Sequence, residues 1–357
     1  MKEAIVFSGG GAYGAYEVGI VKYLLSRQSP VNPAVYTGAS VGGFNAALMV
    51  SQSASPPADA ARHLEQVWLN NVVVNPKTLE NGVFRLRGDV PKYIESALAS
   101  RDVSGTLAEF TGDTVYLLQD MMQLAAAFAT SKQPLVQRAL GMLDVSAFFD
   151  NEPLRNLIRT TIDFAAVRNS TTELRIAATN WNVGTVRVFG NSDMTDDRGP
   201  SIVMGSTAIP SVFPPVPIDG SLYADGGVLA NTPLGPALAA KAEVIHAIYL
   251  TPNPADISIP RVENTFDTVE RMMTIMVSGK IITDVEHIRR VNRVIASTAP
   301  AGFAPVTVHL YNPHSALGSL VGMLNFEREP IEALIEQGYK AAETHDCERQ
   351  GCELASM

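Results

Sequence analysis

EAIVFSGGGAYG, residues 3–14, places a short apolar run directly before a cluster of glycines. The run 3–7 has the length and composition of a buried strand, and apolar residues recur at helical spacing from about residue 16 to 26. Glycine between a strand and a helix allows a tight turn that other residues disfavour. The segment therefore predicts a strand, a glycine turn and a helix in succession.

The same unit occurs again at VYTGASVGG, residues 35–43. A minimal strand runs into a GxSxG pattern made by Gly38, Ser40 and Gly42, and an apolar helix is expected over residues 44–50. In this context the glycines permit a strained turn that lifts the serine oxygen away from the backbone. Ser40 is therefore a candidate nucleophile, and a glycine-rich turn with an incidental serine is the competing interpretation.

The rest of the chain alternates between strand and helix patterns after a helix-rich middle. Strand patterns cover residues 173–179, 183–189, 243–250 and 306–311, the first two as a hairpin, and helical patterns cover about 60–70, 85–170, 264–296 and 330 onward. Such alternation predicts an α/β fold with a parallel-rich central sheet sandwiched by helices. We expect a main domain over residues 1–310 with a helical insertion at about 85–170, and a strand end with C-terminal helices over 311–357.

The first glycine loop is a candidate anion cradle. Backbone N–H groups in a loop between a strand and a helix can point at a developing negative charge, and Gly10 and Gly11 are the best placed of Gly9, Gly10 and Gly11. Gly9, Gly11 and Gly14 also satisfy GxGxxG, which suggests a dinucleotide site. That interpretation requires an acidic residue at the end of the second strand, where the sequence has Ser40 instead. Dinucleotide binding is therefore the least favoured function.

A third motif, Asp225-Gly226-Gly227, follows a short strand pattern at Tyr223-Ala224. By itself it would be an ordinary glycine turn. Together with the serine turn and the triple-glycine loop, it makes Asp225 a candidate base. An ionised carboxylate can take the proton from a serine hydroxyl and so activate it for attack.

The three motifs together resemble the patatin-like phospholipase family, whose catalytic blocks are a GGGxxG loop, a GxSxG turn and a DGG or DGA motif. They occur here in the family's order, and residues 205–216 resemble the ASxAxPxxFPP stretch that precedes the aspartate in that family. The resemblance covers roughly residues 3–235. It implies a patatin-like catalytic domain and a lipid acyl hydrolase of phospholipase A or lysophospholipase type, a serine carboxylic-ester hydrolase.

The resemblance also implies roles for particular residues. Ser40 would be the nucleophile that forms an acyl-enzyme, Asp225 its base, and the loop Gly9–Gly11 the oxyanion hole, with no cofactor and no metal. One departure is that many members have Arg or Lys at the second position after GGG, whereas this chain has Tyr13. The effect of that change on the substrate headgroup stays open.

Three other interpretations compete with a Ser-Asp dyad. Ser40, Asp225 and either His309 or His314 follow the chain order of a Ser-His-Asp esterase. The motifs are also compatible with a catalytically inert module, or with one that a protein partner activates.

Two further expectations concern packing. His246 alternates with apolar residues in a strand pattern and is expected to be a packed residue. The apolar, methionine-bearing middle, residues 117–143, is expected to be core, with a lid or lipid-facing wall as the alternative.

The composition limits the kinds of partner and the location that can be expected for this protein. The net charge of -9 argues against a nucleic-acid binder and against purely electrostatic contact with anionic membranes, so any membrane contact should be mainly apolar. The family resemblance implies a phospholipid or another acyl-ester lipid as the partner. Without a signal-like N-terminus or a spanning stretch, the expected location is cytoplasmic, with peripheral membrane binding and export by another route left open. Cys347 and Cys352, a CxxxxC spacing without nearby histidine ligands, give only weak evidence for zinc.

Overall fold

The computed structural model describes residues 1–355 except 77, 79, 87–148, 211, 253–264, 299–303 and 320. Most of the predicted helix-rich middle, including residues 117–143, lies outside these residues. Its described end contains a two-residue strand, β4 (Phe149–Asp150), and two short helices, α7 (Glu152–Thr161) and α8 (Phe164–Asn169). Within the described residues, no helix is both long enough and apolar enough to cross a lipid bilayer.

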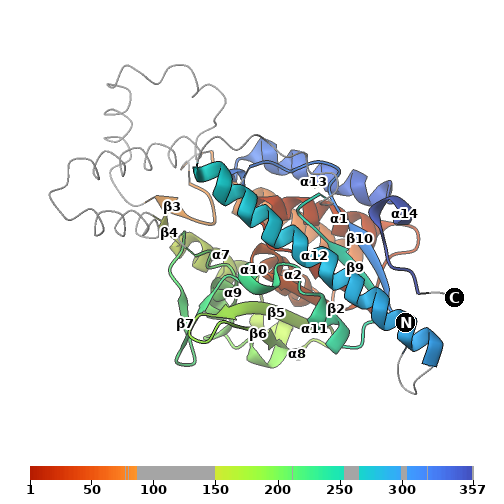
Figure 1. Ribbon diagram of the computed structural model, residues 1–357. Coiled ribbons are helices and arrows are strands. Elements are labelled where there is room, and N and C mark those ends of the chain that lie inside the picture. Colours follow the sequence, from red (N-terminus) through yellow and green to blue (C-terminus); the bar gives the residue numbers. More distant parts are fainter. Residues whose placement is uncertain are drawn as a thin grey trace.

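A sheet of eight strands forms the centre of the fold (Figure 1). Its order is β10-β9-β1-β2-β5-β8-β7, and β6 pairs with β5 beside that path. The pairs from β10 to β5 are parallel, whereas β6, β7 and β8 pair antiparallel. The strands are β1 (Glu3–Phe7), β2 (Pro33–Ala39), β5 (Glu173–Asn180), β6 (Thr185–Gly190), β7 (Val216–Ile218), β8 (Ser221–Ala224), β9 (Val244–Ile248) and β10 (Thr307–Tyr311), with a separate pair β3 (Arg85–Leu86) and β4 (Phe149–Asp150).

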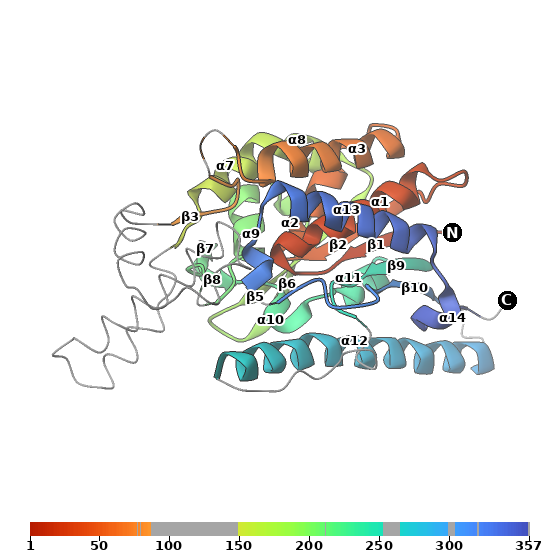
Figure 2. The same ribbon diagram turned by 90° about the horizontal axis from the view of Figure 1, so that it is seen from above.

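Helices cover both faces of the sheet. Figure 2 shows α1, α2, α3 and α13 on one side, and α10, α11 and the long α12 on the other. The helices are α1 (Gly14–Ser26), α2 (Val41–Ser51), α3 (Pro57–Val67), α7 (Glu152–Thr161), α8 (Phe164–Asn169), α9 (Gly199–Ser206), α10 (Gly227–Ala230), α11 (Leu234–Ala239), α12 (Thr265–Thr298), α13 (Arg328–Glu343) and α14 (Cys347–Gln350). The described residues also form shorter helical segments, namely η1 (Gly11–Tyr13), η2 (Trp68–Val72), η5 (Asn191–Asp193) and η7 (Val321–Leu324).

The alternation of side chains along β1 explains the two layers of helices. Ile5 and Phe7 pack into the apolar core under α1 and α2, whereas Ala4 and Val6 pack into a second core that includes residues of α12. Successive side chains of a strand point to opposite faces, so a strand that is apolar throughout must be covered on both sides. This confirms the parallel-rich α/β sandwich predicted from the sequence.

The register of the parallel strands places the two glycine turns side by side. Phe7 at the end of β1 pairs with Gly38 near the end of β2. The carboxyl ends of parallel strands lie at the same edge of a sheet, so the chain leaves β1 and β2 next to each other. The predicted strands and the β5–β6 hairpin are confirmed. The helix expected at 60–70 instead begins at Pro57 and ends in the π-helical segment η2.

Candidate active site

Ser40 sits on a strained turn between β2 and α2. Its backbone has φ 54° and ψ -133°, which a non-glycine residue rarely adopts. The flanking glycines are required by close backbone contacts: a Cβ at Gly42 would lie 2.6 Å from the carbonyl oxygen of Ser8, and one at Gly38 would overlap the carbonyl of Gly42. This is the geometry that a GxSxG turn provides to expose a serine oxygen.

A second serine fixes the backbone of this turn. The N–H of Ser40 donates to Oγ of Ser206 at 3.0 Å, and that hydroxyl donates to the carbonyl of Ala177 on β5 at 2.8 Å. Ser206 is buried at the end of α9. The hydroxyl thus joins the turn, the neighbouring strand and a helix. The sequence analysis did not single out Ser206 for this role.

Asp225 meets Ser40 at the carboxyl edge of the sheet. Ser40 Oγ donates to Asp225 Oδ2 at 2.6 Å, and the N–H of Gly227 donates to Oδ1 at 2.6 Å. The backbone of Asp225 is held by its own N–H, which donates to Ala208, and by the hydroxyl of Thr179, which donates to its carbonyl. A Cβ at Gly226, the other glycine of the motif, would overlap the carbonyl of Ala177. The two residues named by the motifs therefore lie in direct contact.

The carboxyl of Asp225 is buried, and burial raises its pKa from 3.8 to about 6 because the charged form loses its hydration. The hydrogen bonds from Ser40 and Gly227 act in the opposite direction and limit the rise. A carboxylate with a pKa near 6 is ionised at neutral pH and is a stronger base than an ordinary aspartate. That value suits acceptance of a proton from a hydroxyl group.

The triple-glycine loop lies beside this pair, and its three N–H groups are not equivalent. Gly9 donates to the carbonyl of Asn231 at 3.0 Å, while the side-chain amide of Asn231 donates back to Gly9. The N–H groups of Gly10 and Gly11 have no hydrogen-bond acceptor within the described part of the chain. Gly10 and Gly11 therefore remain as candidate donors to an anion, whereas the N–H of Gly9 is already used within the protein.

Close packing explains why this loop is made of glycine. A Cβ at Gly10 would lie 2.5 Å from Cδ1 of Leu250. Gly11 has a φ of 56°, and a Cβ there would overlap the carbonyl oxygen of Met323 in η7. Tyr13, which stands where many family members carry a cation, is buried and donates its hydroxyl to the carbonyl of Ser319 at 2.6 Å. Tyr13 therefore holds the C-terminal segment over the loop.

A buried carboxyl group forms hydrogen bonds next to the glycine loop. Glu17 on α1 accepts the N–H of Ser8 at 2.6 Å and the side-chain amide of Asn45 at 2.9 Å. Asn45 in turn accepts the indole N–H of Trp68 at 2.9 Å. Burial raises the pKa of Glu17 well above its ordinary value. The sequence analysis missed this network, although an acidic residue within an apolar helix pattern was the available signal.

An apolar pocket opens from Ser40. Its space, counted together with the open mouth, is about 510 Å³. Apart from Gly11, Ser40 and Thr207, the wall is made of apolar and aromatic side chains. They are Val41, Phe44, Trp68, Val72, Val83, Leu154, Leu157, Ile209, Phe213, Leu324 and Phe326. The pocket is therefore an apolar surface that ends at Ser40.

The structure does not assemble a Ser-His-Asp triad. All six histidines lie in the described part of the chain, and none is hydrogen-bonded to Ser40 or Asp225. His309 is on β10, three strands away from β2, which corresponds to about 14 Å at the usual strand spacing. His314 is exposed, and the expected packing of His246 is confirmed by its burial against Tyr311.

Comparison with known proteins identifies the family. The sequence profile of patatin-like phospholipases matches residues 5–238, a range that includes most of β1, the triple-glycine loop, the Ser40 turn and the Asp225 motif. The chain belongs to the patatin-like phospholipase family. Membership supports lipid acyl hydrolysis as the general class of activity.

Other comparisons add little to this assignment. No curated protein matches the sequence. Among solved structures, VipD from Legionella pneumophila is similar, with 12% sequence identity and a TM-score of 0.40 over 96% of this chain and 67% of that chain. A similarity at this level does not bear on function.

Proposed function

We propose that this patatin-like protein hydrolyses fatty acyl esters of lipids, as a phospholipase A or lysophospholipase, through a dyad of Ser40 and Asp225. The observation that carries the proposal is the hydrogen bond of 2.6 Å from Ser40 Oγ to the buried carboxylate of Asp225. A serine hydroxyl is a weak nucleophile until a neighbouring base takes its proton. The apolar pocket that opens from the same oxygen supports a long acyl chain as substrate.

In the proposed first half-reaction, Asp225 accepts the hydroxyl proton as Ser40 Oγ bonds to the ester carbonyl carbon. The carbonyl oxygen becomes an oxyanion, and the N–H groups of Gly10 and Gly11 donate to it. Asp225 then gives the proton to the leaving alcohol oxygen as the ester C–O bond breaks. This step leaves the acyl group on Ser40 and releases the lyso-lipid or alcohol.

Water completes the proposed cycle. It gives one proton to Asp225 while its oxygen adds to the acyl carbonyl carbon, and the same N–H groups hold the second oxyanion. Breakdown of this intermediate returns the proton to Ser40 Oγ and releases the fatty acid. No cofactor is needed, because each proton moves between water, Asp225 and the reacting oxygens.

A fluorophosphonate probe and a lipid panel test the proposal together. The probe labels only an activated serine, so the wild-type chain should be labelled, and Ser40→Ala should not. Phosphatidylcholine, lysophosphatidylcholine and a diacylglycerol, with released fatty acid measured, then define the substrate. A folded wild-type protein that resists the probe would refute the dyad. Labelling without hydrolysis of any lipid would instead favour a chain that needs a protein activator.

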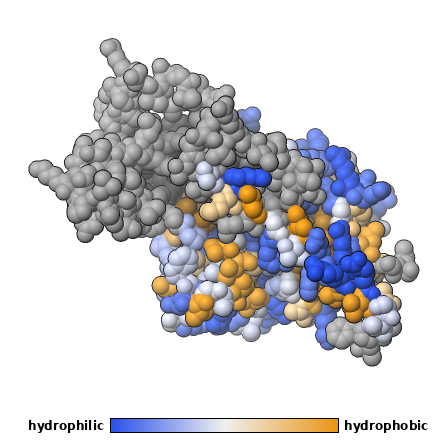
Figure 3. Space-filling view, in the orientation of Figure 1, coloured by the Kyte–Doolittle hydropathy of each residue, from blue (hydrophilic) through white to orange (hydrophobic). Residues whose placement is uncertain are grey.

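We further propose that lipid aggregates contact the face formed by the β5–β6 hairpin and α10. Val186 and Val188 on β6, and Val228 and Leu229 next to Asp225, are large apolar side chains exposed to solvent. Figure 3 shows hydrophobic side chains gathered over this region. The net charge of -9 makes electrostatic attraction to anionic lipids a poor alternative, so apolar contact should dominate.

Sedimentation with neutral phosphatidylcholine vesicles tests this contact. The double variant Val228→Ser with Leu229→Ser should bind vesicles less than the wild type does. Val291→Ser with Val294→Ser is the matched control, because these valines are exposed on α12. Equal binding by both variants and the wild type would refute the assignment of the membrane-contact face.

A further inference from the structure

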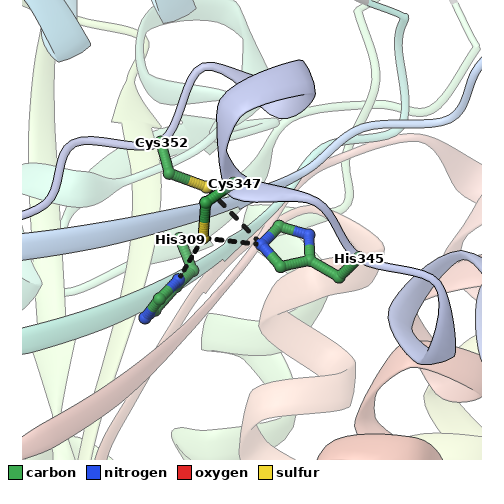
Figure 4. Close-up of side chains that lie close together, drawn as sticks. All are labelled: His309, His345, Cys347 and Cys352. Atoms are coloured by element: carbon green, nitrogen blue, oxygen red, sulfur yellow. Dashed lines mark hydrogen bonds between the residues drawn. The ribbon is translucent and has the colours of Figure 1, made fainter.

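Four side chains with metal-binding atoms meet at the C-terminal end of the molecule. His309 comes from β10, His345 follows α13, Cys347 is the first residue of α14, and Cys352 follows that helix. Their ligand atoms all lie within 4.8 Å of one another. Figure 4 shows the two sulfur atoms and the two imidazole rings pointing toward a common centre. The sequence-based expectation that the cysteines lack histidine neighbours is wrong: His345 stands two residues before Cys347, and folding brings His309 of β10 against them.

The distances between these atoms match a tetrahedral metal site. Cys347 Sγ lies 3.3 Å from His309 Nδ1 and 3.4 Å from His345 Nε2, and Cys352 Sγ lies 3.5 Å from His345 Nε2. In a tetrahedral zinc site with bonds of about 2.3 Å to sulfur and 2.0–2.1 Å to nitrogen, the edge between sulfur and nitrogen is ~3.6 Å. The four side chains need only small movements to bind one ion.

We propose that His309, His345, Cys347 and Cys352 bind one zinc ion as a structural site. Two sulfur and two imidazole ligands in tetrahedral geometry favour zinc among common divalent metals. Four protein ligands leave no coordination position for water or substrate, so the site has no hydrolytic role. Each cysteine releases its thiol proton to solvent on binding, and the two thiolates balance the charge of the ion.

Packing around the cluster already orients the ligands. His309 stacks on His246 with ring centroids 5.1 Å apart, and His345 lies 4.4 Å from the ring of Tyr311. The backbone N–H of Leu310 donates to Cys352 Sγ at 3.2 Å, an interaction that also stabilises a thiolate.

The position of the site indicates what the ion would do. Val308 on β10 pairs with Glu353 in an isolated bridge, with N···O distances of 2.6 Å and 2.9 Å. β10 is the outer strand of the sheet, and this tail covers part of its free edge. Arg289 and Asn292 on α12 also bind the side chain of Glu353. Chain ends still fray more readily than interior segments, so a further link would stabilise this tail. The proposed ion joins the tail, the end of α13 and β10, and so stabilises the folded chain.

Metal analysis of the full chain, purified under reducing conditions without chelator, tests the proposal. The wild type should contain about one zinc per chain, and cobalt added after zinc removal should give thiolate-to-cobalt charge-transfer bands and the d–d bands of tetrahedral cobalt. Cys347→Ser and Cys352→Ser should each reduce the bound zinc more than tenfold. His314→Ala is the control, since this exposed histidine lies outside the cluster, and it should retain the metal.

Further measurements keep the test decisive if a serine variant fails to fold. His345→Cys supplies another zinc ligand at the same place and should retain metal, and circular dichroism reports whether each variant is folded. Zinc removal should lower the melting temperature of the wild type, and added zinc should restore it. A folded, reduced wild type that binds neither zinc nor cobalt would overturn the proposal. So would a cobalt spectrum that survives both cysteine substitutions, or a Cys347–Cys352 disulfide whose reduction yields a chain without metal affinity.

Discussion

Replacing Asp225 by Asn should make the protein more stable while it removes the proposed base. The folded chain holds this carboxyl at a pKa of about 6, against an ordinary 3.8, because the side chain is buried. The folded state therefore binds the proton more tightly than the unfolded state does, and ionisation at neutral pH opposes folding. An asparagine has nearly the same shape, carries no charge, and can still accept the N–H of Gly227.

The size and pH dependence of this effect follow from the two pKa values. A difference of about two pKa units corresponds to ~3 kcal/mol, at about 1.4 kcal/mol for each unit. Asp225→Asn should exceed the wild type by this amount above about pH 6. The difference should shrink as the pH falls from 6 toward 4, because the wild-type carboxyl becomes protonated, and it should vanish below that. An unfolding entropy of about 2 cal/mol/K per residue converts 3 kcal/mol into a rise in melting temperature of about 4 °C for 357 residues.

Thermal unfolding of both proteins, followed by circular dichroism at pH 8, pH 6 and pH 4.5, measures this difference. Asp197→Asn makes the same chemical change at an exposed aspartate and should leave the melting temperature within about 1 °C of the wild type. Fatty acyl ester hydrolysis should be lost only in the Asp225 variant. An Asp225→Asn protein no more stable than the wild type at pH 8 would refute the reasoning, since the buried charge would then have no measurable effect on folding.

The remaining predictions concern catalysis. The value of kcat/KM for a p-nitrophenyl ester should fall about tenfold per pH unit below pH 6, as Asp225 is protonated, and a profile flat to pH 4.5 would exclude it as the base. Gly10→Val should lower kcat at least about a hundredfold, because the valine side chain would crowd Leu250 and block one proposed oxyanion donor. A folded variant with normal kcat would refute the role of this N–H group. Ser206→Ala should lower kcat about tenfold at unchanged KM, because the hydroxyl of Ser206 orients the N–H of Ser40. Ser206→Thr keeps a hydroxyl and should restore part of kcat. A change in KM alone would contradict this positioning role.

The parts of the fold that the sequence could predict depend on short-range patterns. β1, β2, the β5–β6 hairpin and α12 are each encoded in a continuous run of apolar periodicity bounded by turn residues. The π-helical end of α3 was not predictable in this way. Its residues continue a helical pattern, and only packing shows that the helix widens at Trp68, whose indole donates to Asn45.

In the candidate site, too, only the features encoded in short-range patterns could be predicted from the sequence. The turns that carry Ser40 and Asp225 were readable because glycine is required at fixed positions within each turn. The partners of Ser206 and Glu17 could not be predicted from the sequence. Ser206 contacts Ser40, 166 positions away in the chain, and Glu17 contacts Ser8 on the other side of the glycine loop. A lone serine or glutamate in an apolar segment has many possible partners, and only the three-dimensional structure selects one of them.

The triple-glycine loop shows that even a motif recognised in the sequence depends on distant residues. The carbonyl of Met323 in η7 packs against Gly11 and leaves no room for a side chain there, and Tyr13 holds the neighbouring Ser319. The helix that follows η7, α13, packs closely along α1, because Gly338 admits the backbone of Tyr16. α1 itself begins directly after the loop. The two N–H groups proposed to bind the oxyanion are therefore positioned by the last fifty residues of the chain as well as by the first twenty-six.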